Sequence, residues 1–204
     1  MLRKLLFSFR EKEIYHSIIE SLVAALEAKD HYTKGHSERV AIMSYELSKR
    51  LGIKGSELES IHIAAHLHDI GKIGVPDKVL NKTGKLLVHE WEYMKMHPQT
   101  GFDILSKSKK LEHISKIVLY HHERWDGKGY PTGIADFNIP LGSRIISICD
   151  SIDAMTSNRP YREAMSFEIC MKEIIINKGI MFDPVLVEYV EENLDFMRDI
   201  IEFK

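Results

Sequence analysis

Apolar residues recur at steps of three and four along most of the chain, whereas the alternation of a half-buried strand is nearly absent. This spacing matches the period of an α-helix and predicts an all-α fold. Glycines, prolines and N-cap residues mark the ends of the expected helices. These helices cover about residues 13–29, 35–51, 56–70, 88–96, 98–105, 111–120, 143–157, 166–178, 184–192 and 194–203, with a short helical turn opened by Pro76.

One long segment interrupts the helical pattern. Residues 121–142, HHERWDGKGYPTGIADFNIPLG, hold four glycines and two prolines in 22 residues. Long loops in compact domains are often functional, so this loop is a candidate for shaping a site or contacting a partner. Its glycines permit tight turns, while Trp125 and Tyr130 can anchor the loop or face a base.

Length, charge and cysteine usage narrow the class of protein. The 204 residues suffice for one domain, and we expect a helical extension over residues 1–19 followed by a single domain over 20–204. A formal net charge of -2 provides no basic surface for duplex nucleic acid. No apolar run is long enough to predict a membrane span. Cys149 and Cys170 lie in apolar helical patterns, which favours buried reduced thiols in a cytoplasmic protein.

Polar side chains fall on or beside the apolar faces of several expected helices. They are His36, His68, Asp69, His97, His121, His122 and Asp150. An unpaired buried carboxylate costs several kcal/mol, which is a large share of a domain's net stability of about 5–15 kcal/mol. Divalent cations compensate such groups. Because adjacent residues on a helix diverge by about 100°, His68 can bind one ion while Asp69 extends toward a second.

Simpler interpretations exist for individual residues. A single inward histidine is most often a hydrogen-bonded core residue, His121 and His122 can cap a helix end, and His68 can hydrogen bond Asp69 locally. A competing metal set on one helix follows steps of four and three and consists of His62, His66 and Asp69. The larger set is preferred because the competing set leaves the other histidines and Asp150 unexplained.

The ordered motifs resemble those of HD-GYP domains, a helical branch of the HD metal-dependent phosphohydrolases. They span about residues 20–194 and read KDHYTKGHSERV, HLHDIGKIGVPDKVLNKTGKL, MKMHPQTGFDIL, HHERWDGKGYPTG, IPLGSRIISICDSIDAMTSNRPYR and FDP. The resemblance implies an HD-domain helical bundle with a long glycine-rich loop. Gly129, Tyr130 and Pro131 form the triplet that names the family, in a loop that either shapes the site or receives a protein partner.

The resemblance also implies a set of metal ligands. One divalent ion would be held by His36, His68, Asp69 and Asp150, and the other by His97, His121 and His122, with Asp69 as the bridge. Iron is the implied metal, with manganese as the alternative and zinc or nickel as further options. Some family members use a glutamate for a third ion where this chain has Tyr32, which favours two ions, although Asp30 lies close in sequence.

The implied activity is hydrolysis of cyclic di-GMP to linear pGpG, with onward cleavage to GMP as an option, through a hydroxide that bridges the two ions. Lys72 would lie beside the scissile phosphate, and Arg159 and Arg162 would grip its oxygens. Without the family, a solvated helix end fits Lys72 and a salt-bridged helix start fits the arginines. Two other functions stay open: the same chemistry on cyclic GMP-AMP or another nucleotide, and a non-catalytic cyclic-dinucleotide sensor.

Overall fold

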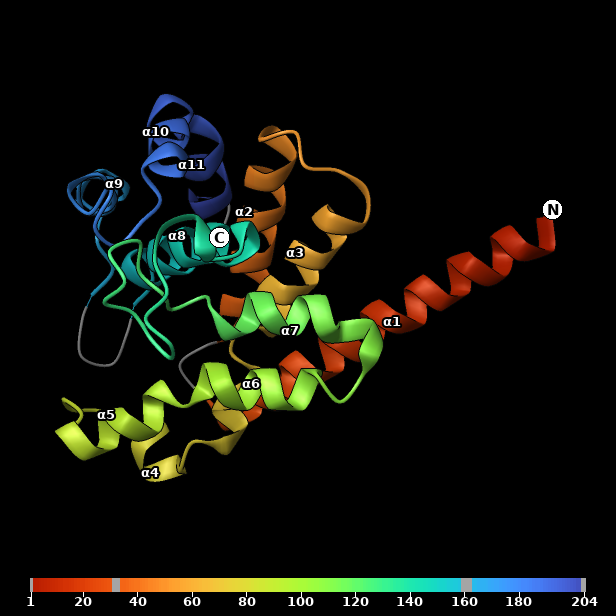
Figure 1. The fold of residues 1–204 in the computed structure, drawn as a ribbon, viewed down its shortest axis with the longest axis horizontal. Helices are drawn as coiled ribbons and strands as arrows, with labels where there is room; N and C mark the ends of the chain where they lie inside the picture. Colours follow the sequence, from red (N-terminus) through yellow and green to blue (C-terminus); the bar gives the residue numbers. More distant parts are fainter. Residues whose placement is uncertain (1, 31–33, 159–162, 203–204) are drawn as a thin grey trace.

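The computed structural model describes residues 2–30, 34–158 and 163–202, with side chains between Ile14 and Ile201. This part of the chain is a bundle of helices without a β-sheet (Figure 1), and the all-α prediction is confirmed. Its α-helices are α1 (Leu2–Lys29), α2 (His36–Arg50), α3 (Gly55–Leu67), α4 (Asp77–Leu80), α5 (Val88–Lys95), α6 (His97–Leu105), α7 (Glu112–Leu119), α8 (Leu141–Thr156), α9 (Phe167–Ile176), α10 (Pro184–Glu192) and α11 (Leu194–Glu202). Short 3-10 helices are η1 (Ile70–Gly74), η2 (Lys109–Leu111) and η3 (Asp136–Asn138).

The core lies where α2, α3, α7 and α8 pack together. Fully buried aliphatic side chains fill it, including Val40, Ile61, Ile117 and Ile145. Each such side chain contributes roughly 1.5–3 kcal/mol when it leaves water. Cys149 and Cys170 are both fully buried, which agrees with the interior positions expected from the sequence. These packed helices form the rigid frame on which the polar residues of the interior are held.

Helix α1 starts at Leu2, so the predicted start near Glu13 was wrong. The charged stretch from Arg10 to Glu13 does not end the helix, because arginine, lysine and glutamate are good helix formers and no glycine or proline occurs in the segment. The C-terminal half of α1 packs on the domain through the buried Ile19 and Leu26. Its N-terminal end projects beyond the bundle (Figure 1). None of the described helices has the length and apolarity to cross a bilayer.

The third helix is shorter than the sequence suggested. It ends at Leu67 rather than near Ile70, and η1 begins at Ile70 after two intervening residues. His68 and Asp69 therefore lie in the turn between the two helices, where His68 Nε2 is 3.3 Å from Asp69 Oδ2. The backbone of η1 crosses α6 so closely that a Cβ on Gly71 would lie 1.9 Å from the His97 carbonyl oxygen. Glycine at this position lets η1 and α6 approach, which brings Asp69 and His97 together.

The predicted interruption of the helix near Pro98 is confirmed, but it lies at Met96 and not at His97 and Pro98: α5 ends at Lys95 and α6 begins at His97. The glycine-rich segment between α7 and α8 is irregular, apart from the single turn η3, as the sequence indicated. Most other helix ends differ from the expected positions by one or two residues, the usual uncertainty of helix boundaries.

Candidate metal centre

The side chains singled out in the sequence converge in the interior as two groups. His36 at the start of α2 meets His68 and Asp69 after α3, and we call these three residues the mixed cluster. The imidazole cluster joins the start of α6 to the turn after α7 and consists of His97, His121 and His122. Within each cluster, one potential ligand atom per residue lies within 4.8 Å of the others. These are the two such groups in the described part of the chain.

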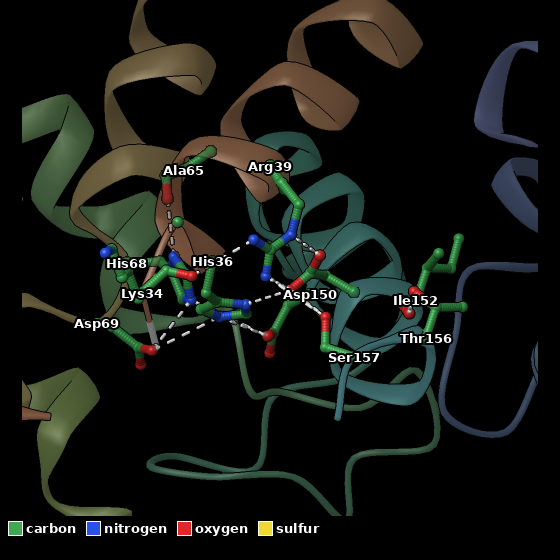
Figure 2. A network of polar contacts seen from close by, with 12 residues as sticks. Lys34, His36, Arg39, Ala65, His68, Asp69, Asp150, Ile152, Thr156 and Ser157 are labelled. Atoms are coloured by element: carbon green, nitrogen blue, oxygen red, sulfur yellow. Dashed lines mark hydrogen bonds and ion pairs between the residues drawn. The ribbon is translucent and has the colours of Figure 1, made fainter. Parts of the chain in front are cut away.

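Asp150 of α8 adjoins the mixed cluster (Figure 2). Its Oδ1 atom lies 3.2 Å from His36 Nε2 and 4.0 Å from His68 Nε2. Electrostatic contact with these imidazoles outweighs burial and holds the pKa of Asp150 well below its usual range. Asp150 therefore stays ionised in the interior and adds a second carboxylate to the site.

Asp69 lies between the two clusters and presents one oxygen to each. Its Oδ2 atom is 3.3 Å from His68 Nε2 and 3.8 Å from His36 Nε2, whereas Oδ1 is 3.4 Å from His97 Nε2. The side chain is 5% exposed. Burial alone would raise its pKa, but the nearby Lys72 and His68 hold the pKa of Asp69 well below its usual value.

Hydrogen bonds to the backbone fix which ring nitrogen each buried histidine presents. His68, His97 and His121 each place Nδ1 within 2.6–2.7 Å of the carbonyl oxygen three residues earlier. A carbonyl only accepts hydrogen bonds, so Nδ1 carries the proton and Nε2 offers a lone pair. His121 can therefore cap its helix and bind a metal ion at the same time. Nδ1 contacts the carbonyl at the helix end, and Nε2 is available to the ion.

In this arrangement, the Nε2 lone pairs of these buried histidines face other acceptors and not hydrogen-bond donors. His97 Nε2 and His121 Nε2 are 3.3 Å apart although both are acceptors in this tautomer. The buried Nε2 of His68 has no hydrogen-bond partner in the described structure, which argues against a local hydrogen bond to Asp69. Converging acceptors of this kind need a cation, so the residues present fit a divalent metal centre.

His36 is oriented by a carboxylate instead of a carbonyl. Its Nδ1 lies 2.7 Å from Oδ2 of the buried Asp153, which in turn accepts two hydrogen bonds from the Arg39 guanidinium. A carboxylate behind a ligating histidine fixes the ring and raises its basicity. Sequence reasoning missed Asp153. Its position one helical turn after Asp150, on the same face of α8, is the signal that could have revealed it.

The two clusters differ in protonation. Burial lowers the pKa of His97 to about 3 and that of His122 to about 4, and it lowers that of His121 well below the usual value. For His36, burial is outweighed by hydrogen bonds to Asp150 and Asp153, which raise the pKa to about 9. The imidazole cluster is therefore neutral at pH 7, while His36 holds a proton when no ion is bound.

Lys72 of η1 lies against Asp69. Its Nζ atom is 2.7 Å from Asp69 Oδ2 and 3.4 Å from Oδ2 of the buried Asp30, which follows α1. Burial disfavours the ammonium, but these carboxylates outweigh it and raise the pKa of Lys72 above its ordinary value. The alternative of a solvated helix end does not apply, because the lysine is paired inside the domain.

The glycine-rich loop closes over the imidazole cluster. The Tyr130 ring lies over His122, with centroids 4.9 Å apart and planes 31° from parallel. The buried Glu123 accepts hydrogen bonds from Thr132 N, Thr132 Oγ1 and Gly133 N, which fastens the loop. A Cβ on Gly129 would lie 2.4 Å from the backbone nitrogen of Arg124. Sequence reasoning missed Glu123, although an acid directly after the histidine pair was a visible signal.

The remaining candidates have other positions. Asp69 belongs to the mixed cluster, whereas His62 packs against Tyr45 and His66, so the described residues do not bring the competing set together around one ion. Trp125 packs against Phe137 and anchors the loop. Tyr32, Arg159 and Arg162 lie outside the described residues.

The fold and the site define an all-helical domain whose buried histidine and aspartate clusters are suited to divalent metal ions. The model of the HD domain family matches residues 20–186. The chain belongs to the HD domain family, and the resemblance inferred from its motifs is confirmed.

Two curated relatives match most of this chain. A cyclic di-GMP phosphodiesterase of Thermotoga maritima is 40% identical over 179 residues, covering 87% of this chain and 49% of that protein. A 3'3'-cGAMP-specific phosphodiesterase of Vibrio cholerae is 37% identical over 186 residues, covering 90% of this chain and 36% of that protein. The chain thus spans about half, or less, of the length of these relatives.

A solved structure shares the fold. The crystal structure of a cyclic GMP-AMP specific phosphodiesterase of Vibrio cholerae superposes with a TM-score of 0.67 at 22% identity, covering 87% of this chain and 48% of that one. At this identity the likeness concerns the helical architecture alone.

Proposed function

We propose that this chain is the catalytic domain of a cyclic dinucleotide phosphodiesterase that hydrolyses cyclic di-GMP to linear pGpG. The observation that carries the proposal is the convergence of histidine Nε2 atoms from two clusters on the two oxygens of Asp69. The relatives named as phosphodiesterases of cyclic di-GMP and of cGAMP support the substrate class.

We assign two sets of ligands, one for each of two divalent ions. Asp69 belongs to both sets. The first set is His36, His68, Asp69 and Asp150, and the second is His97, His121 and His122 with the second oxygen of Asp69. Imidazole combined with carboxylate suits iron or manganese, and zinc and nickel accept the same donors. Bound there, the ions would neutralise phosphate charge and lower the pKa of a coordinated water toward about 7.

Lys72 is assigned to the phosphate. Its ammonium already lies on Asp69, so a phosphate bound at the two clusters would find this charge beside it. Asp30 contacts the same Nζ atom and keeps the lysine in place. Because its pKa is raised, Lys72 stays protonated at neutral pH, which favours stabilisation of the developing negative charge over proton donation to the leaving 3' oxygen.

The phosphodiesterase assignment is tested by hydrolysis of cyclic di-GMP with the anaerobically purified chain loaded with Fe²⁺ or Mn²⁺. We expect pGpG as the product, and the Lys72→Met variant to be strongly impaired. Accumulation of GMP would show onward cleavage. Binding of the dinucleotide without product, even on prolonged incubation, would overturn the assignment in favour of a sensor.

A second candidate substrate is 3'3'-cyclic GMP-AMP, because one relative at 37% identity is named as specific for it. Measuring kcat/KM for the two dinucleotides side by side decides between them. A higher value for cyclic di-GMP supports our proposal. A higher value for cyclic GMP-AMP would replace the substrate and leave the metal assignment in place.

A further inference from the structure

Three histidines outside the metal centre gather on the face of α3 that contacts α1. His62 and His66 lie one helical turn apart on α3, and His16 of α1 faces them. Glu59, one turn before His62, completes the group, which we call the α1–α3 histidine cluster. The steps of three and four between Glu59, His62 and His66 place all three on one face of the helix. None of these side chains takes part in the site described above.

The spacing of the His62 and His66 rings is that of two residues able to share an ion, whereas the His16 ring lies farther away and would have to move toward it. The His62 and His66 centroids are 4.7 Å apart, and those of His16 and His62 are 6.4 Å apart. In the metal centre the corresponding distances are 4.9 Å for His97 and His122 and 5.2 Å for His36 and His68. A Zn–N bond of about 2.1 Å puts the ring centroids of two ligands roughly 5 Å apart.

His62 is oriented in the same way as His68, His97 and His121 of the metal centre, by a backbone carbonyl that faces Nδ1. His62 Nδ1 is 3.3 Å from the backbone carbonyl oxygen of Ala41, so Nε2 is the nitrogen with a free lone pair. Burial, with a contribution from His16, lowers the pKa of His62, and a neutral imidazole is the form that binds metal.

The partly exposed Glu59 carboxylate and His16 imidazole complete the donor set. His16 Nε2 lies 3.6 Å from Glu59 Oε1, and both side chains are about two-fifths exposed, at 43% and 42%. Rotation of these exposed side chains can bring their donor atoms onto an ion held by His62 and His66. Three imidazoles with one carboxylate or water form a tetrahedral donor set that zinc favours.

We propose that the α1–α3 histidine cluster binds a zinc ion through His16, His62 and His66, with Glu59 or water as the fourth ligand. The ion links α1 to α3. Because α3 leads directly into His68 and Asp69, zinc at this site fixes the orientation of α1 relative to the helix that carries the metal centre.

The test is zinc binding to the metal-free full chain, measured by equilibrium dialysis for wild type, His16→Ala and His62→Ala. Each substitution should lower the bound zinc by one ion per chain, because it removes a ligand of the same ion. His16 and His62 lie on different helices, and alanine is favourable in both, so the two variants check each other. His89→Ala is the control, since His89 is an exposed histidine of α5.

Limited proteolysis provides a second measurement, because it reports whether zinc links α1 to α3. Zinc should slow proteolysis within α1 in the wild type and in His89→Ala, but not in His16→Ala or His62→Ala. Zinc stoichiometry equal to wild type in both cluster variants would overturn the proposal. An equal loss in His89→Ala would do the same, because it would show adventitious binding to surface histidines.

Discussion

The two halves of the metal centre reach similar geometry by different means. In the mixed cluster, His36 is held by the side chain of Asp153, and carboxylates surround the imidazoles. In the imidazole cluster, His97 and His121 are held by backbone carbonyls. The pKa of His36 is therefore raised to about 9, whereas that of His97 is lowered to about 3. The comparison teaches that an ion bound by the mixed cluster would have to displace a proton at neutral pH, whereas an ion bound by the imidazole cluster would not.

Among the changes that distinguish the two clusters, removal of a ligand from the imidazole cluster should have the largest effect on activity. His121→Ala leaves the Oδ1 side of Asp69 with two imidazoles, and we expect hydrolysis of cyclic di-GMP to fall by at least about 10³-fold. Metal analysis should show the loss of one ion and retention of the other. His113→Ala, an exposed position on α7, serves as the control. Full activity and two ions in His121→Ala would refute the assignment of this cluster.

The second-largest loss of activity should come from replacing Lys72, which is paired with Asp69 and Asp30. Lys72→Met removes the charge beside the phosphate and should lower kcat by about 10²–10³-fold, while both ions stay bound. The matched control is Lys78→Met on α4, an exposed lysine outside the metal centre. If metal were lost together with activity in Lys72→Met, the lysine would be needed for the integrity of the site and not for the reaction.

Substitution of Asp153, which orients His36, should change the metal affinity of one cluster and leave that of the other unchanged. Asp153→Asn weakens the acceptor that orients the ring, so metal affinity of the mixed cluster should fall by about 10–100-fold. The imidazole cluster has backbone acceptors and should keep its affinity. Competition with a graded chelator measures both affinities. Equal weakening of the two ions would show that the clusters do not differ as described.

Much of this arrangement was predictable from the sequence. The helical period, the break before Pro98 and the glycine-rich loop are local features, and the structure contains them. The burial of His36 and His68 was also predictable, because each lies in register with an apolar stripe.

Contacts between distant segments were not predictable in this way. The pairing of His36 with Asp153 joins residues 117 positions apart, and the contact of Lys72 with Asp30 depends on how α1 packs. The end of α3 at Leu67 was missed because apolar periodicity continues through Ile70. There the close crossing of Gly71 with α6, a tertiary contact, decides the backbone conformation.

Acidification should have the smallest effect of these changes, and it should lower the metal affinity of the mixed cluster alone. In the metal-free chain the raised pKa of about 9 means that His36 is protonated below that pH, so an ion must displace the proton. Affinity of the mixed cluster should fall about tenfold per pH unit between about pH 8 and 6. His97 and His122, with pKa values of about 3 and 4, stay neutral over this range, so the imidazole cluster should hold its ion. Metal retention after dialysis at each pH measures the difference, and parallel release from both clusters would contradict it.

The central claim is that Asp69 serves both clusters with its two oxygens. Metal analysis of the anaerobically purified chain, wild type against Asp69→Ala, tests it most directly. We expect about two ions per wild-type chain and the loss of both, together with phosphodiesterase activity, in the variant. A folded Asp69→Ala protein that retains its full metal content would contradict the shared carboxylate.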